Sequence, residues 1–369
     1  MTFFLRYYAI IVFLLTFDCC ICLLNRVKMS SSQVTIKDIA KALGVSVATV
    51  SRALSGSYEV NPHTKAEVLE KAKELRYKPN IQARNLLKRR SNMIGVVVPE
   101  FVTFFFPEII IGIQEVCNKL GYQVLISQSN ESSSLEAKNV EMLEESMVEG
   151  MIVSVAKDCR NIDLYQRLIS ERMPIVFVNR VISELKASQV VIDDRKWAFK
   201  VTEHLIKCGY RRIAHLGGNE NLSVTKERMQ GYLNALAAYG IPVNENLIMY
   251  VGVQQDRAKI GVDYLMSLRE RPDAIFAIND PIAVGCMLEL KKRGMKVPDD
   301  IAIAGFSESP VGRILDLTSV YQPTFEIGRK AAELLLKQIR DYNTPVETII
   351  LDAKLNIRHS TLPLHKSVR

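Results

Sequence analysis

The sequence predicts an α/β protein in which a small all-α head precedes a large body of two doubly wound parallel sheets. Residues 33–78 have helical spacing and no strand-like run. From Met93 onward, short β-branched apolar stretches alternate with amphipathic helices, as in sheets buried on both faces. The body contains about 270 residues of such βα units, which is too many for one sheet, so two lobes are expected.

Three helices are expected in the head, and each has its own capping signal. Thr35 is a plausible N-cap for the first helix, and Gly44 can end that helix in the left-handed conformation. Ser46 can cap a second helix almost at once, so the two helices form a helix-turn-helix. Asn61 and Pro62 start the third helix.

The second helix, within GVSVATVSRALSG (44–56), has an outer face that is nearly uncharged. Its core-facing stripe is Val50, Ala53 and Leu54. Side chains that meet base edges in the DNA major groove must be short, and a guanidinium there can donate two hydrogen bonds to guanine. The outer face fits that description, because it carries Val47, Ala48, Ser51 and Arg52.

Positive charge is concentrated in the head and in the segment that follows it. Between Gln33 and Asn92 the chain has twelve lysines and arginines and five acidic residues, against a formal net charge of +8 for the whole chain. This distribution fits a polyanion, either nucleic acid or an anionic membrane. A merely solvated basic face would give the same count.

The first 28 residues form a separate hydrophobic segment. Apolar residues run over about eighteen positions and are interrupted by Asp18, which is borderline for a membrane helix. Three interpretations stay open: translation that starts at Met29, a membrane anchor, or a signal peptide. The last has a single N-terminal charge, Arg6, and no clean cleavage site. Arg26 and Lys28 would keep the following chain cytoplasmic even behind an anchor.

The sequence offers no catalytic, metal or cofactor site. The four cysteines and the histidines of the body have no metal-ligand spacing. LGGNEN (216–221) lacks the pattern of a phosphate loop, and GFSESP (305–310) has Ser309 where a nucleophile elbow needs glycine. An enzyme is therefore unsupported, and no cofactor is expected.

The head and many stretches of the body resemble the LacI/GalR (lactose/galactose repressor) family of bacterial transcriptional regulators. In the head the similarity is carried by VTIKDIAKALGVSVATVSRALSGSYEVNPHTKAEVLEKAKELRYKPNIQARNL, which is highly specific. In the body it continues through IGVVVP, PIVFVNR, HLIKCGYRRIAHLGG, AINDPIAVG and GMKVPDDIAIAGFSESP. The resemblance covers residues 33 to about 360 and implies a periplasmic-binding-protein-like body.

The resemblance also implies a division of the chain into four parts. These are the hydrophobic segment 1–28, a helix-turn-helix DNA-binding domain at 33–78, a hinge helix and linker at 79–92, and an effector-binding and dimerisation domain at 93–366. In the last part, the N-lobe would comprise about 93–192 and 322–350, and the C-lobe about 193–321 and 351–366.

The implied function is a ligand-responsive transcriptional regulator, most often a repressor, that binds a pseudo-palindromic operator in double-stranded DNA as a homodimer, with a tetramer left open. Val47, Ala48 and Arg52 would read the major groove. A hinge helix would enter the minor groove, with Leu86 as an apolar wedge unless it is an ordinary packing leucine. The phosphate contacts would come from Thr35, Ser46, Thr49, Ser51 and Asn61, and the hinge contacts from Asn80, Ala83 and Leu86.

A small-molecule effector, a sugar or sugar derivative, would bind between the lobes. The positions that match the family are Phe105 or Phe106 for stacking, Asn179, Arg228, Asn279 or Asp280, and Ser307. Asn179 and Ser307 stand where aspartate is common in the family. Loss of these carboxylates puts the usual contacts with sugar hydroxyls in doubt. A less polar, differently hydroxylated or anionic effector is therefore a hypothesis.

The competing hypothesis is a secreted or membrane-anchored solute-binding protein, suggested by the hydrophobic leader together with a sensor fold. A basic helix-turn-helix has no use in such a protein, so we expect a cytoplasmic, nucleoid-associated regulator instead.

Overall fold

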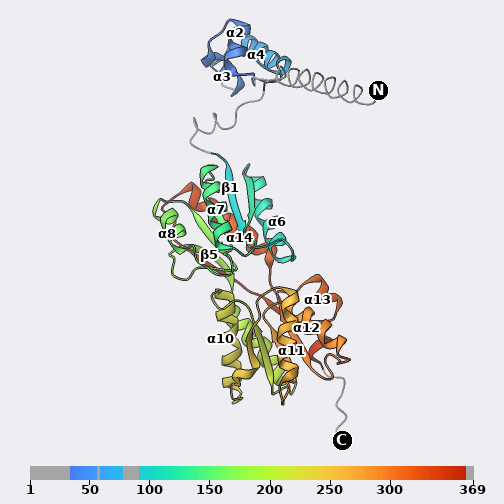
Figure 1. Ribbon diagram of the computed structural model, residues 1–369. Helices are drawn as coiled ribbons and strands as arrows, with labels where there is room; N and C mark the ends of the chain where they lie inside the picture. Colours follow the sequence, from blue (N-terminus) through green and yellow to red (C-terminus); the bar gives the residue numbers. More distant parts are fainter. Residues whose placement is uncertain (1–33, 56–58, 78–90, 363–369) are drawn as a thin grey trace, which may run out of the picture. The chain divides into compact units, whose positions relative to one another are not determined.

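The computed structural model describes residues 34–55, 59–77 and 91–362. The chain divides into two compact units, one ending at Arg89 and the other beginning at Arg90 (Figure 1). Several expectations fall outside the described residues: they concern the hydrophobic segment 1–28 and the hinge positions Asn80, Ala83 and Leu86.

Among the described residues of the first unit, the head, three helices form where the sequence predicts them: α2 (Ile36–Leu43), α3 (Val47–Leu54) and α4 (Pro62–Glu74). Gly44 ends α2 with a left-handed φ of 65°. Ser46 accepts a hydrogen bond from the Thr49 N–H at 3.0 Å and so starts α3. The three helices enclose a small core around Ile39, Val50 and Val68, all fully buried.

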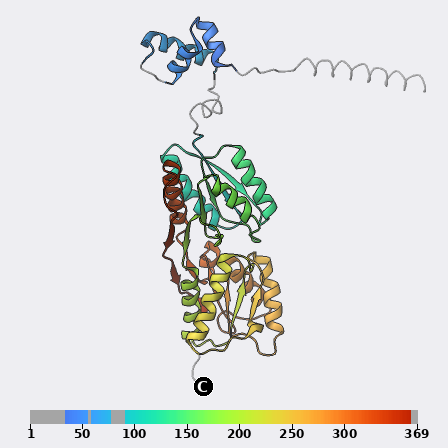
Figure 2. The ribbon, with the colours of Figure 1, turned by 90° about the vertical axis from the view of Figure 1, so that its left-hand side faces the viewer.

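The second unit, the body, contains two sheets in two lobes (Figure 2). The N-lobe sheet has the order β11-β5-β4-β3-β1-β2, and all of its pairs are parallel. Its strands are β1 (Met93–Val98), β2 (Gln123–Gln128), β3 (Met151–Val153), β4 (Ile175–Val178), β5 (Ser188–Ile192) and β11 (Thr348–Leu351). Its helices are α6 (Phe105–Lys119), α7 (Ser133–Glu145), α8 (Ile162–Ser170) and α14 (Thr324–Arg340).

The C-lobe sheet repeats this order as β12-β10-β9-β8-β6-β7, with only β12 antiparallel to its neighbour. Its strands are β6 (Ile213–Gly217), β7 (Ile248–Tyr250), β8 (Ala274–Ala277), β9 (Ala302–Phe306), β10 (Thr318–Tyr321) and β12 (Lys354–Asn356). Its helices are α9 (Asp194–Lys207), α10 (Ser223–Ala238), α11 (Ala258–Ser267), α12 (Asp280–Lys292) and α13 (Pro310–Ile314), with short 3₁₀ turns η1 (Glu245–Leu247), η2 (Gln255–Arg257) and η3 (His359–Thr361).

Both sheets are buried on two faces, which explains their continuous apolar runs. In β1, Ile94 and Val96 belong to the core that includes α6 and α14, whereas Val97 belongs to the core with α7 and α8. The α6–α14 contact is so close that a Cβ at Gly112 would meet the Phe325 carbonyl oxygen at 2.1 Å. The predicted fold class, an α-helical head with a doubly wound two-lobed body, is confirmed.

The chain passes from one sheet to the other three times, after β5, after β10 and after β11. The two sheets have the same strand order. The loops that follow the carboxyl ends of their parallel strands lie in one region of the body, which is where ligands bind in such folds. Within residues 34–55, 59–77 and 91–362, none of the helices has the length and hydropathy that a bilayer span requires.

Candidate functional site

In the head, the face of α3 that the sequence singles out is exposed to solvent. Val47 is 41% exposed, and Ala48, Ser51 and Arg52 are exposed with it, while Val50 and Ala53 are buried. The helix therefore presents small apolar groups, one hydroxyl and one guanidinium, and no carboxylate. This chemistry matches base-edge readout in a major groove.

Arg52 has an acidic neighbour in the free head. Its Nε lies 3.5 Å from Glu59 Oε2, and both side chains are more than half exposed. Such an exposed pair contributes little to stability. Arg52 can therefore exchange Glu59 for another acceptor at small cost.

The predicted phosphate-contacting residues at the helix starts already take part in capping. Thr35 uses both of its donors on Asp38, because its N–H and its hydroxyl donate to Oδ2 at 2.8 and 2.7 Å. Asn61 Oδ1 accepts from the His63 N–H at 2.9 Å, and its Nδ2 has no hydrogen bond to any residue that the structure describes. Asn61 is thus the better placed of the two to donate to a phosphate oxygen, and Thr35 would first have to release Asp38.

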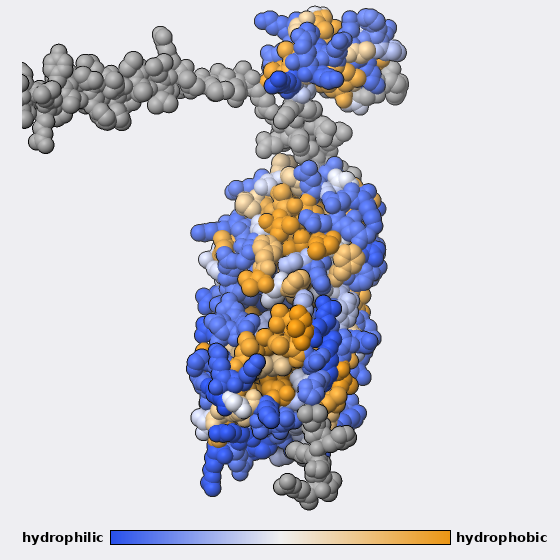
Figure 3. All heavy atoms as spheres, turned by 90° about the vertical axis from the view of Figure 1, so that its right-hand side faces the viewer, coloured by the Kyte–Doolittle hydropathy of each residue, from blue (hydrophilic) through white to orange (hydrophobic). Residues whose placement is uncertain are grey.

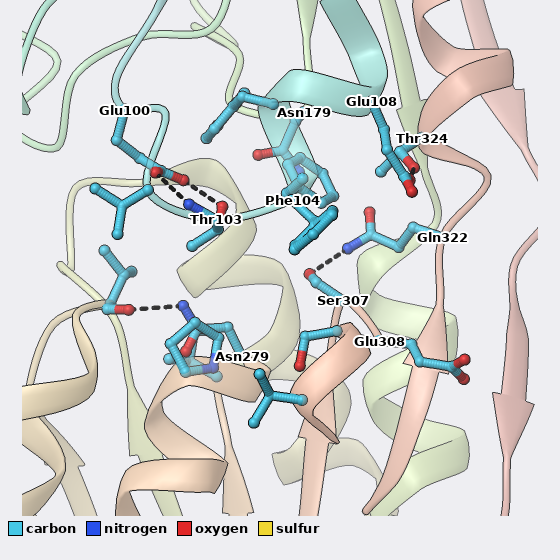
Figure 4. Close-up of a pocket in the computed structure, with 18 of the residues that line it drawn as sticks. Glu100, Thr103, Phe104, Glu108, Asn179, Asn279, Ser307, Glu308, Gln322 and Thr324 are labelled. Atoms are coloured by element: carbon cyan, nitrogen blue, oxygen red, sulfur yellow. Dashed lines mark hydrogen bonds between the residues drawn. The ribbon is translucent and has the colours of Figure 1, made fainter. Parts of the chain in front are cut away.

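In the body, a cavity of about 910 Å³ lies between the carboxyl ends of the strands of both lobes. Segments that follow β1, β4, β7, β8, β9 and β10 line it. In Figure 4, side chains from both lobes point into it, with the Phe104 ring between Asn179 and Ser307. This is where ligands bind in doubly wound folds.

Most of the effector positions suggested by the resemblance line this cavity: Phe105, Phe106, Asn179, Arg228, Asn279 and Ser307. Asp280, the alternative to Asn279, does not line it, and that expectation is corrected. The Asp280 side chain is fully buried under the β9–α13 loop, where Oδ2 accepts from the Ser309 N–H at 2.7 Å and Oδ1 from the Ser319 hydroxyl. Burial raises the pKa of this carboxyl to about 6. Asp280 therefore holds a loop of the cavity in place.

Asn279 lines the cavity, but its amide is already committed. Oδ1 caps α12 by accepting from the Ile282 N–H at 3.0 Å, and Nδ2 donates to the Val253 carbonyl at 2.9 Å (Figure 4). The side chain ties the end of β8 to the loop after β7. Its role is to shape the wall.

Arg228 is the buried cation of the C-lobe wall. Its Nε donates to Asp194 Oδ1 at 2.7 Å and its Nη1 to the Ile278 carbonyl at 2.5 Å. The guanidinium carbon lies 3.7 Å from the ring centroid of Phe306. No hydrogen bond from Nη2 to a described residue is present, so this nitrogen is the donor left for a ligand.

Three consecutive phenylalanines precede and begin α6, and they differ in exposure. Phe106 is 3% exposed and belongs to the N-lobe core, with the Arg180 guanidinium 5.8 Å from its ring centroid. Phe104 is 60% exposed although it lines the cavity. Phe104, which the sequence interpretation missed, is therefore the ring most free to cover a ligand, and Phe105 contacts both the core and the cavity.

Asn179 and Ser307 occupy equivalent places at the ends of β4 and β9. Both have left-handed backbones, with φ of 58° and 68°, which turn the chain into the cavity. Gln322, also missed, lies just after β10 and donates from Nε2 to Ser307 Oγ at 2.6 Å. Its Oε1 is buried and has no hydrogen-bond partner among the described residues. Gln322 precedes Pro323 in the sequence, and nothing in this local sequence predicts that its side chain lines the cavity.

A three-helix DNA-binding head and a two-lobed body with a cleft at its strand ends define one class of protein, the regulators that carry a sensor and a DNA-reading module in a single chain. Two family models match. Residues 35–80 match bacterial regulatory proteins of the lacI family, and residues 91–359 match the periplasmic binding proteins and sugar-binding domain of the LacI family. The chain belongs to the LacI family of bacterial transcriptional regulators.

Individual relatives span nearly the whole chain. The HTH-type transcriptional regulator DegA of Bacillus subtilis is 31% identical over 334 residues, which cover 90% of this chain and 99% of DegA. The HTH-type transcriptional repressor CytR of Escherichia coli is 31% identical over 341 residues, covering 92% and 99%. A solved complex of the transcriptional regulator CelR with cellobiose is 30% identical and covers 89% of this chain and 99% of CelR, with a TM-score of 0.69. These relatives are regulators rather than enzymes, and the solute-binding alternative is not favoured.

Proposed function

We propose that this chain is a ligand-responsive repressor that binds a pseudo-palindromic operator as a dimer and takes a small-molecule effector in the cleft of its body. The observation that carries the proposal is the exposed face of α3, which has small side chains, one arginine and no acid. A second unit with a cleft lined by aromatic, apolar and some polar side chains in the same chain supplies the site for a signal.

In this proposal α3 enters the major groove. Val47 and Ala48 contact thymine methyl groups or exclude other bases, and Arg52 donates to guanine O6 and N7. Phosphate oxygens around the groove accept hydrogen bonds from Ser46, Thr49, Ser51 and Asn61. Each head would read one half-site, so two heads would require a two-fold dimer.

The body offers a face for such a dimer. Figure 3 shows apolar side chains gathered in patches on the side of the body where α6 and α13 lie in Figure 1. Ile314 on α13 is 81% exposed and does not line the cavity, whereas Ile111 on α6 and Val311 on α13, 55% and 52% exposed, belong to both the surface and the cavity lining. Exposed apolar groups on this scale are typical of contact surfaces. A second copy of the chain is the proposed partner.

The effector would act on the relation between the lobes. Arg228 connects the cavity to Asp194, the first residue of α9 after the first crossing between the sheets. Gln322 lies at the second crossing and donates a hydrogen bond to Ser307 in the cavity wall. A ligand that binds one arrangement of the lobes better than another would shift the population of operator-competent dimers.

The test is selection of genomic fragments by the purified chain, followed by mobility-shift titration at several salt concentrations. We expect sequence-specific binding to a palindromic site that weakens as salt rises. The Arg52→Ala variant should lose the preference for one base pair of each half-site. Binding that does not discriminate the selected site from random DNA would overturn the proposal.

A further inference from the structure

The charges and rings of the cleft indicate which chemistry it accepts. We infer that the cleft takes an uncharged ligand that carries a flat apolar or heteroaromatic ring, in preference to a free sugar or an anion. This inference rests on the proposed role of the cleft as the effector site. It chooses among the less polar, differently hydroxylated and anionic effectors that the substituted positions 179 and 307 left open.

The arginines of the cavity wall are already neutralised. Arg180 forms a two-pronged, buried ion pair with Glu131, with distances of 2.8 and 2.9 Å. Arg228 is paired with Asp194 at 2.7 Å, and Arg313 lies 3.6 Å from Glu308. These three are the cations of the described lining. An anionic ligand would therefore have to compete with a protein carboxylate for each of them.

Most carboxylates of the wall are engaged as well; among the described lining residues, Asp256 is the exposed carboxylate that has no hydrogen bond or ion pair. Glu100 accepts from the Thr103 N–H at 2.9 Å and from the Thr103 hydroxyl, and Glu108 accepts from the Thr324 hydroxyl (Figure 4). Glu308 points away from the cavity and pairs with Arg358 at 2.9 Å. A sugar is held by acceptors that take two hydroxyl protons at once. Glu100, Glu108 and Glu308 already use part of their acceptor capacity on protein donors, so they offer a free sugar fewer acceptor sites than their number suggests.

What remains open to a ligand is apolar and aromatic. Phe104, Tyr321 and Phe325 all line the cavity and are 60%, 44% and 40% exposed. Val102 and Ile111 extend the same lining. Aromatic rings left this exposed inside a cleft gain most when a flat apolar surface covers them.

The polar atoms open to a ligand lie mainly on uncharged groups, apart from one arginine nitrogen and the Asp256 carboxylate. They include the Asn179 amide, the Ser307–Gln322 pair, Arg228 Nη2 and the side chains of Gln254, Gln255 and Asp256. The buried Oε1 of Gln322, at the second crossing, has no partner among the described residues and can accept a hydrogen bond from a donor on the ligand. These groups can orient one or two polar atoms of a ring-bearing molecule, such as a carbonyl facing Arg228 and an N–H or O–H facing Gln322.

Calorimetry with two matched sets of probes tests the inference. The first set is phenyl β-D-glucopyranoside, D-glucose and D-glucose 6-phosphate, and the second is adenosine, D-ribose and adenosine 5′-monophosphate. We expect at least one neutral ring-bearing probe to bind at least about tenfold more tightly than both its sugar and its phosphate. Equal or tighter binding of the free sugar or the phosphate in both sets would overturn the inference, and so would no binding of either ring-bearing probe at about 1 mM.

Two variants assign the binding to the cleft. Phe104→Ala removes the exposed ring and should weaken the bound probe about tenfold or more, a typical loss for a stacking contact. Phe101→Ala is the matched control, because Phe101 is 41% exposed and does not line the cavity, and it should bind like the unmodified chain. Equal loss in both variants, or in neither, would contradict the inference.

A separate readout distinguishes the inference from the function on which it rests. The best probe is added to the chain bound to its selected operator in a mobility shift. A probe that binds the cleft and leaves operator binding unchanged would count against the proposed effector role. Operator release by a free sugar or a sugar phosphate alone would support that role and overturn the ligand class.

Discussion

Arg228 and Asp194 form a buried ion pair, with Nε 2.7 Å from Oδ1 and side chains 4% and 7% exposed. Arg228 lines the cavity, and Asp194 starts α9 immediately after the chain has crossed from the N-lobe sheet. Burial raises the pKa of the Asp194 carboxyl and lowers the pKa of the Arg228 guanidinium. Each charge therefore depends on the other, and the pair joins the cavity wall to the first crossing.

Removing one member of this pair should be much worse than removing both. Arg228→Met leaves the Asp194 carboxylate buried without its partner and should cost about 3–5 kcal/mol in the free energy of unfolding. The double variant Arg228→Met, Asp194→Asn should recover most of that loss. Urea denaturation of the three proteins measures both steps. A double variant that is no more stable than Arg228→Met would mean that the two side chains act independently.

Replacing Arg52 should remove discrimination at one base pair. Arg52→Ala should lose about 1–3 kcal/mol of preference there, because two hydrogen bonds to guanine are lost. Lys88→Ala, whose position lies outside the described residues, should instead weaken cognate and random DNA alike and lower the salt slope by about one. Titrations on operator and scrambled DNA separate the two effects. If both variants weakened both DNAs equally, α3 would not be the reading helix.

Removing the acidic neighbour of Arg52 should strengthen DNA binding. Glu59→Gln takes away a carboxylate that lies 3.5 Å from the Arg52 guanidinium and would approach the phosphates. Because the pair is exposed and screened, the gain should be modest, about two- to fivefold, and should shrink as salt rises. The control is Glu59→Gln combined with Arg52→Ala, which tests whether the gain depends on Arg52. Unchanged or weaker binding by the single variant would contradict the competition between Glu59 and DNA.

The elements that were predictable from sequence are those whose signals are local. Ser46, Asn61 and Gly44 cap or end their helices within three residues, so the head follows from short-range chemistry. The central strands, such as β1, β4 and β8, have continuous apolar runs that are buried along almost their whole length. The edge strands β11 and β12 escaped prediction, because they are short and partly exposed and pair with β5 and β10 from far along the chain.

The cavity was harder to predict, because adjacent residues of like chemistry point in opposite directions. Asn279 and Asp280 are neighbours, yet the N-cap geometry of α12 keeps one at the wall and buries the other. Phe104, Phe105 and Phe106 are identical and adjacent, so the local sequence does not predict that the Phe106 ring is the one buried in the core. Gln322 gains its position only from the crossing between the sheets. Tertiary contacts determine which residues line this cavity, and the local sequence pattern does not encode those contacts.

The single tryptophan of the chain should report the movement of the lobes. Trp197 lies in the first turn of α9, 8% exposed, with Lys196 Nζ 5.3 Å from its ring centroid. Lys196 also pairs with Asp352 at the third crossing, at 3.1 Å. Rearrangement of the crossings by a ligand should therefore change the emission of Trp197, with the same midpoint as the calorimetric titration. Trp197→Phe should abolish the signal and leave the heat of binding, and a silent Trp197 at calorimetric saturation would exclude movement at these crossings.

Acidification should destabilise the body through His215. The ring is fully buried between Tyr232 and Phe276, with Nδ1 3.0 Å from the Phe276 carbonyl, and burial lowers its pKa to about 4. The unfolded chain takes up a proton near pH 6.5, whereas the folded chain does not until about pH 4. Stability is therefore full above pH 6.5 and is lost as the pH falls, by about 2 kcal/mol at pH 5. His215→Phe removes this proton uptake whatever it does to absolute stability. Urea denaturation at about pH 7.5 and pH 5 should accordingly give the unmodified chain a pH-dependent loss about 2 kcal/mol greater than that of the variant, and equal losses in the two proteins would mean that His215 does not stay neutral in the fold.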